Sequence, residues 1–118
     1  MLTQGTQIEL AANLAIAAVA DRELSGSQMQ EIVCELTQHM RYENVIYFVL
    51  DLQNVEFMAS DCLGALVTFL SDVEQIRGRI ALANCQPNVA FLFKVTRLDA
   101  AFPLYDDIDE AREHIIHG

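Results

Sequence analysis

Residues 45–52, VIYFVLDL, limit the fold of this chain more than any other segment. The run is almost continuously apolar and is rich in β-branched and aromatic side chains. This composition is typical of a strand whose two faces are both covered by other parts of the chain. The segment therefore predicts a central strand in a layered domain, with Asp51 as a polar exception near its end.

Two long amphipathic helices are expected before and after this strand. Apolar residues recur at spacings of three and four in both places, which is the period of a helix with one buried face. Ser25 or Ser27 suits the N-cap of the first helix, and Gly78 suits the stop of the second. Two shorter helices follow later in the chain. The four helices are expected at 27–40, about 63–77, 88–95 and 106–114.

Strands alternate with these helices along the chain. A length of 118 residues fits one domain, so residues 1–118 are expected to form a single α/β domain. Its mixed central sheet should pack with about four helices. Residues 45–52 and 79–84 flank a crossover helix, so these two strands should be parallel. The remaining strands are expected at 6–11, 14–20 and 104–105.

The net charge of −10 and the three cysteines narrow the choice of partner and compartment. An acidic surface repels phosphate backbones, so no nucleic-acid partner is expected, whereas a protein with a basic patch is favoured. Widely spaced cysteines indicate free thiols in a reducing compartment and no metal site. The N-terminus lacks a signal-peptide pattern, and the apolar run 10–20 is too short to span a bilayer. We expect a soluble cytoplasmic protein without direct membrane insertion.

No pattern in the sequence places a nucleophile beside a base. Glycine-rich phosphate loops and the GxSxG pattern are absent, and none of the three histidines has a visible nucleophile partner. Cys62 lies beside a helix start, where the pKa of a thiol can be lowered, but no base can be assigned to it. We therefore expect no catalytic residue, no cofactor and no enzyme activity.

A short polar joint, Ala59-Ser60-Asp61-Cys62, links the central strand to the helix that follows it. In open α/β sheets, sites usually lie at the carboxyl ends of the strands. The first N–H groups of a helix also lack partners within the helix, and they favour a negative charge nearby. A side chain of Ser60 or Asp61 is expected to cap this helix.

Residues 49–66, VLDLQNVEFMASDCLGAL, resemble the central motif of STAS domains, the fold of anti-sigma factor antagonists. The family pattern is an apolar strand ending Leu-Asp-Leu, then Val-x-Phe, then Asp-Ser-Ser/Thr-Gly-Leu-Gly at a helix start. Looser likeness at 23–25, 79–84 and 98–107 extends the resemblance over nearly the whole chain. The matching motif residues are Leu50, Asp51, Leu52, Val55, Phe57, Met58, Ser60, Leu63, Gly64 and Leu66.

Three residues depart from the family pattern: Ala59, Asp61 and Cys62. In phospho-switched antagonists, a partner kinase that is also the anti-sigma factor phosphorylates the second hydroxyl of the motif, and here that position is Asp61. A carboxylate carries about −1 where a phosphate carries about −1.5 to −2. Asp61 therefore either imitates the phosphorylated state in part or only caps the helix, and Ser60 is the alternative phosphoacceptor.

The resemblance implies a non-enzymatic regulatory module that binds a kinase-type anti-sigma factor or a related regulator. The alternative that it implies is an accessory subunit of a lipid-transport ABC complex or of a larger STAS-containing signalling assembly, and a homodimer also stays open. The partner is expected to contact the turn at 58–64 and the start of the first helix. The residues expected there are Arg22, Glu23, Ser25, Met58, Ala59, Ser60, Asp61, Cys62 and Leu63.

Overall fold

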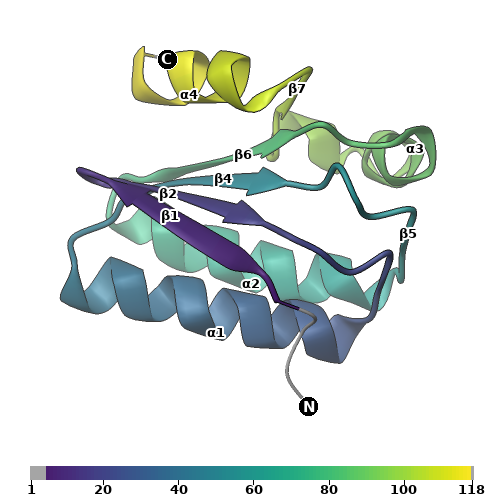
Figure 1. The fold of residues 1–118 in the computed structure, drawn as a ribbon, viewed down its shortest axis with the longest axis horizontal. Helices are drawn as coiled ribbons and strands as arrows, with labels where there is room; N and C mark the ends of the chain where they lie inside the picture. Colours follow the sequence, from purple (N-terminus) through teal and green to yellow (C-terminus); the bar gives the residue numbers. More distant parts are fainter. Residues whose placement is uncertain (1–4, 118) are drawn as a thin grey trace.

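The computed structural model describes residues 5–117 and places a five-stranded sheet between layers of helices (Figure 1). The sheet has the strand order β1-β2-β4-β6-β7. Its strands are β1 (Gln7–Ala11), β2 (Leu14–Ala18), β4 (Tyr47–Asp51), β6 (Arg79–Ala83) and β7 (Leu104–Tyr105). The helices are α1 (Gly26–Tyr42), α2 (Asp61–Gln75), α3 (Pro87–Val95) and α4 (Ile108–His117), with a short 3₁₀ turn at Leu98–Ala100.

The sheet is mixed, and β4 is its central strand. β4 pairs in parallel with β2 and with β6, and β7 continues the parallel set, whereas β1 pairs antiparallel with β2. The expected mixed α/β fold with four helices and a parallel 45–52 to 79–84 pair is therefore confirmed. Phe48, Val49 and Leu50 are completely buried, because both faces of β4 are covered.

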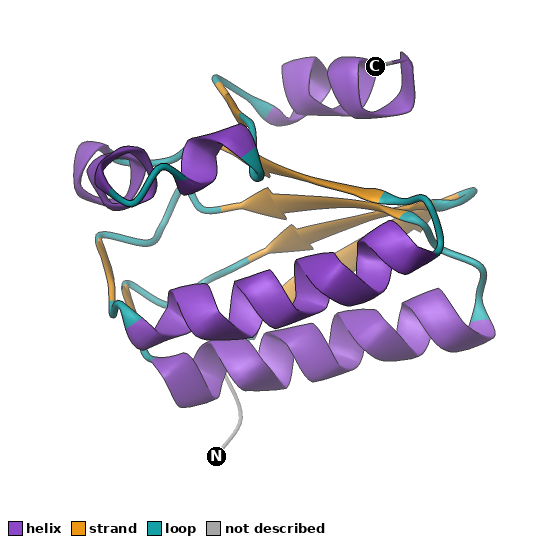
Figure 2. Cartoon of the chain, turned by 180° about the vertical axis from the view of Figure 1, so that it is seen from behind, coloured by secondary structure: helices purple, strands orange, loops and turns teal. Residues whose placement is uncertain are grey.

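Side-chain alternation along the strands supplies a separate core on each face of the sheet. Phe48 and Leu50 point toward α1 and α2, which lie side by side under the sheet (Figure 2). The ring of Phe48 meets Phe69 of α2 edge to face, with centroids 5.0 Å apart. Val49 points to the opposite face, where it packs with Ala111 and Ile115 of α4.

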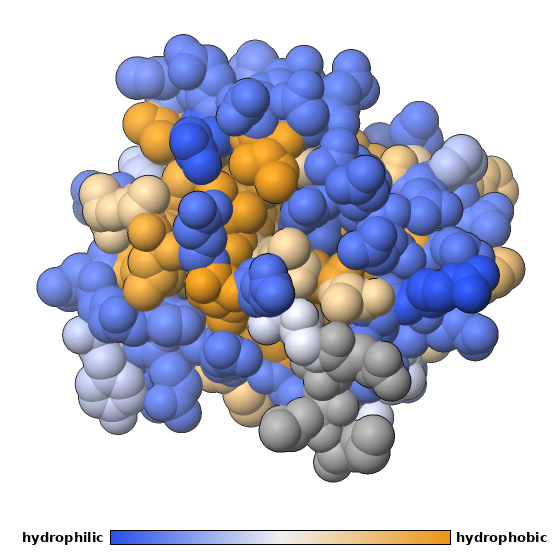
Figure 3. Space-filling model, viewed as in Figure 1, coloured by the Kyte–Doolittle hydropathy of each residue, from blue (hydrophilic) through white to orange (hydrophobic). Residues whose placement is uncertain are grey.

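The outer face is covered less completely than the inner one. α4 lies over β4, β6 and β7, and Figure 3 shows apolar side chains at the surface between α4 and the edge strand β1. Leu10 of β1 and Ile116 of α4 are partly exposed. None of the helices that the structure describes is long and apolar enough to cross a membrane.

Two short strands, β3 (Glu23–Leu24) and β5 (Phe57–Met58), were not expected from the sequence. They pair in parallel and form a second, two-stranded sheet. A strand of two residues has no alternation long enough to recognise, so its pairing depends on the folds of the segments that flank it. This small sheet joins the starts of α1 and α2, as described below.

The end of α2 differs from its expected form. The helix ends at Gln75, and Arg77 rather than Gly78 takes the left-handed backbone conformation, with φ 61°. The role of Gly78 is instead close packing against the loop before β4. A Cβ at this position would overlap the carbonyl oxygen of Ile46 and lie 2.8 Å from Cγ1 of Val73.

We expect Gly78→Ala to lower the free energy of unfolding by about 1–3 kcal/mol, because the added methyl meets a backbone oxygen that moves only with its strand. Gly64→Ala is the matched control. Gly64 lies inside α2, and apart from its chain neighbours and the nearby backbone of its own helix, no described atom lies within 4 Å of the position that a Cβ would take there. This control should stabilise the protein by up to about 1 kcal/mol through helix propensity. Urea unfolding followed by circular dichroism measures both, and equal effects would contradict the close-packing role.

Candidate functional site

The carboxyl edge of the sheet is where the chain brings its helix starts together. β2, β4 and β6 run in the same direction, and the helices that follow the first two strands return under the sheet (Figure 1). The small β3–β5 sheet lies at this edge, immediately before α1 and α2 in the sequence. The N-termini of α1 and α2 are therefore close to each other, as expected for sites of open α/β sheets.

Backbone hydrogen bonds join the two sequence segments that were expected to bind a partner. The Phe57 N–H donates to the carbonyl of Arg22 at 3.1 Å, and the Ala59 N–H donates to the carbonyl of Leu24 at 2.9 Å. The segment before α1 thereby lies in register with the segment before α2. We call the exposed part of these segments, 22–25 and 57–61, the docking surface.

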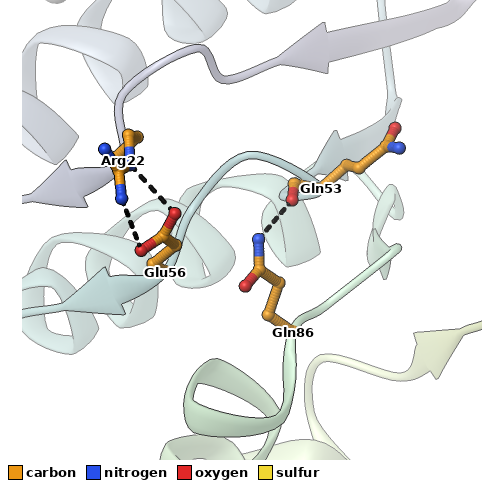
Figure 4. A network of polar contacts seen from close by, with 4 residues as sticks. All are labelled: Arg22, Gln53, Glu56 and Gln86. Carbon is orange, nitrogen blue, oxygen red and sulfur yellow. Dashed lines mark hydrogen bonds and ion pairs between the residues drawn. The ribbon is translucent and has the colours of Figure 1, made fainter.

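A bidentate ion pair between Arg22 and Glu56 lies at the margin of the docking surface. Arg22 Nε and Nη2 donate to the two carboxylate oxygens of Glu56 at 2.9 and 3.0 Å (Figure 4). These hydrogen bonds lower the pKa of the Glu56 carboxyl and raise that of the Arg22 guanidinium. Both side chains are exposed, so water and salt screen their attraction. The pair acts mainly by fixing the orientation of Arg22 along β5.

A second set of contacts holds the connection between β4 and β5. Asp51 Oδ1 accepts hydrogen bonds from the Gln53 N–H and from Asn84 Nδ2, both at 3.1 Å. The Gln86 side chain donates to the Gln53 carbonyl at 2.6 Å (Figure 4). Asp51, the polar exception in the apolar strand, thus ties the ends of β4 and β6 to each other.

The docking surface contains a shallow apolar hollow of about 380 Å³. Phe57 lines it with 57% of its area exposed, and this residue was absent from the expected contact set. The register of β5 decides this exposure, because a two-residue strand gives no sequence signal for which face is free. The lining residues are Glu23, Leu24, Ser25, Gln28, Phe57, Met58 and Ala59.

The start of α1 is capped as expected. Ser25 has an extended backbone, and its Oγ accepts a hydrogen bond from the Gln28 N–H at 3.2 Å. The Gln28 side chain returns the contact by accepting from the Ser25 N–H at 2.8 Å. This reciprocal capping box holds the backbone of 25–28, so the α1 side of the hollow has a defined shape.

The expected side-chain cap of α2 is wrong. Ser60 occupies the N-cap position with helical backbone angles, φ −63° and ψ −26°, and makes no capping hydrogen bond. The Cys62 and Leu63 N–H groups donate instead to the carbonyls of Ala59 and Ser60, at 3.0 and 3.1 Å. Backbone acceptors thus replace the hydroxyl. Asp61 is the first residue of the helix, and its carboxylate accepts no hydrogen bond from a residue within 5–117.

Cys62 and Leu63 face the core, so the exposed part of this turn consists of Ala59, Ser60 and Asp61. The Cys62 thiol donates to the Leu24 carbonyl at 3.2 Å. Burial, followed by the nearby Asp61 carboxylate, raises the pKa of Cys62 to about 11. The helix start therefore does not lower the pKa of this thiol, because desolvation outweighs its effect.

Metal ligation is not supported by the arrangement of these side chains. Among residues 5–117, no group of three or more His, Cys, Asp or Glu side chains is placed to hold a metal ion. Among the described residues, Glu23 carries the only titratable side chain in the lining of the hollow. What the site offers is an exposed aromatic ring, a polar margin and two helix starts, which is the chemistry of a protein contact.

Comparisons with known proteins point to one family. A family model for the STAS domain matches residues 15–111. A Thermotoga neapolitana homologue of TM1081, whose name places it with anti-sigma factor antagonists, is 34% identical over 67 residues. That match covers 57% of this chain and 59% of the relative, so the matched segment spans little more than half of the relative's length.

Two solved structures show the same fold. The anti-sigma factor antagonist SpoIIAA in its unphosphorylated form has a TM-score of 0.81 at 19% identity, with 97% of each chain covered. An anti-sigma factor antagonist from Mycobacterium paratuberculosis has a TM-score of 0.79 at 21% identity, with 95% of this chain and 93% of that chain covered. Since the family model also spans most of the sequence, this protein belongs to the STAS domain family.

Proposed function

We propose that this protein is a non-enzymatic regulatory module that binds a kinase-type anti-sigma factor or a related regulator through its docking surface. The observation that carries the proposal is the joining of 22–25 and 57–61 into one exposed surface beside an apolar hollow. Similarity to anti-sigma factor antagonists supports a partner of this class. A cytoplasmic location is part of the same proposal.

Phe57 is the proposed anchor of the interface. Large aromatic side chains next to a pocket and within a polar margin tend to dominate the binding energy of protein interfaces. The exposed side chain of Glu23 lines the same hollow as this ring. Together with the net charge of −10, it favours a partner whose contact surface is basic.

Phe57→Ala should weaken binding to the candidate anti-sigma factor by about tenfold or more, which is the effect of losing a typical aromatic hot spot. Phe91→Ala is the matched control, because Phe91 is 66% exposed but lies on α3, outside the docking surface. Isothermal titration calorimetry of the natural chain and both variants measures the difference. Equal affinities for all three proteins would remove Phe57 from the interface.

We propose that Asp61 occupies the position at which phospho-switched antagonists carry the phosphorylated hydroxyl. This chain would then lack the usual phosphoacceptor. A carboxylate cannot take phosphate from a serine kinase as a stable ester, and Ser60 lies one residue earlier in the sequence. One residue turns a side chain by about 100° around a helix, so a kinase that fits the usual position should miss Ser60. Binding would then not be regulated by this phosphorylation.

Incubation with the candidate serine kinase and ATP tests this proposal by intact mass spectrometry. The natural chain should keep its mass, whereas Asp61→Ser should gain roughly 80 Da, the mass of one phosphoryl group. A gain of that size in the natural chain that is lost in Ser60→Ala would show that Ser60 is the acceptor. Stable co-purification with an ATPase or with a STAS-containing array, in place of a kinase, would favour the accessory-subunit function.

The expectation that none of the three thiols is a catalytic nucleophile is tested by alkylation. Cys34 is exposed, whereas burial, followed by Asp51, raises the pKa of half-buried Cys85 to about 11, as burial and Asp61 do for Cys62. Because the thiolate is the reactive form, iodoacetamide at pH 8 should label Cys34 first and label Cys62 and Cys85 only slowly. Their labelling should increase as the pH approaches 11. Peptide mass spectrometry gives the rates, and fast labelling of Cys62 near pH 7 would reopen its candidacy as a nucleophile.

A further inference from the structure

Gly26 is a glycine whose backbone does not require one. It is the first residue of α1, and within residues 5–117 only Gly5 is a glycine with positive φ. An alanine would therefore fit the backbone of Gly26 and would favour the helix, since glycine is a poorer helix former than alanine. The reason for a glycine must lie in the space around its Cα.

That space is filled by the carboxylate of Asp61. A Cβ on Gly26 would lie 2.5 Å from Oδ2 and 2.8 Å from Oδ1 of Asp61, which is too close for any ordinary contact. Apart from the chain neighbours of Gly26 and the nearby backbone of its own helix, all three of the atoms nearest to this Cβ position belong to the side chain of Asp61. The missing side chain on α1 and the acid on α2 are thus complementary in shape.

The contact also places one negative charge at two helix starts. Asp61 lies in the first turn of its own helix, and its carboxylate lies against the first residue of α1, which has no acid in its own first turn. The first N–H groups of a helix carry partial positive charge, so each helix gains from the same carboxylate. Asp61 thereby connects the two halves of the docking surface.

We propose that Gly26 is a positioning residue that directs the Asp61 carboxylate inward, over the first turn of α1, rather than outward toward a partner. This inference deepens the proposed function. It rests on that function in one respect only, namely that residue 61 corresponds to the phosphoacceptor position. A side chain at position 26 would rotate the carboxylate outward, because Asp61 is exposed and its outward side faces solvent. An acid at the phosphoacceptor-equivalent position would then face a partner only in such variants.

A double-mutant comparison tests the contact through a reversal of sign. In the Asp61→Ala background, Gly26→Ala should raise the Tm by about 2–4 °C, because only helix propensity changes. In the natural background the same substitution should lower the Tm or leave it without this gain, because the methyl displaces the carboxylate. An equal rise of Tm in both backgrounds would overturn the proposal.

The side-chain conformation of Asp61 provides a readout that a general loss of stability would not move. Three-bond NMR couplings that report χ1 of Asp61 should change in Gly26→Ala and stay the same in Ser27→Ala, the neighbouring control on the first turn of α1. Unchanged couplings in Gly26→Ala would contradict the proposal that Gly26 positions the Asp61 carboxylate. Both measurements use the isolated protein, so their failure is distinct from failure of the partner-binding experiments.

Discussion

Parallel pairing of β4 with β2 and with β6 is the constraint on which the rest of this structure depends. Parallel strands bring their carboxyl ends to one edge, and each connection must return along a face of the sheet. α1 and α2 therefore pack together under the sheet and begin at the same edge. The apolar side chains of β4 enforce this arrangement, because Phe48 and Val49 need cover on opposite faces.

The edge produced in this way is held by contacts between segments that are distant in sequence. Asp51 and Asn84 tie the ends of the two central strands, and the small β3–β5 sheet aligns the starts of α1 and α2. The Asp61 carboxylate fills the space left by Gly26 at the meeting of the two helices. A surface built on such contacts is preorganised, which reduces the entropy lost when a partner binds.

The parts of the fold that were predictable are those with a long repeating pattern. The helical period located α1 and α2, and the apolar run located β4, because burial of one face or of both faces leaves a regular signal. The same reasoning missed β3 and β5, whose two residues carry no period. It also expected a side-chain cap from Ser60 or Asp61, and it could not decide the pKa of Cys62, because both depend on atoms that the local sequence does not show. Backbone carbonyls of the turn decide the cap, and burial of the thiol decides its pKa.

The sequence by itself determined the layered α/β class, the central strand, a serine N-cap at Ser25 or Ser27 and the presence of an acid at residue 61. These features follow from local pattern or from residue identity, so they are readable along the chain. Only the tertiary structure decided which side chains of the turn reach the surface, that Phe57 is exposed, and that the carboxylate of Asp61 meets Gly26. The physical reason is that exposure and close contact depend on how separate segments pack, and no local pattern encodes the distance between residues 26 and 61.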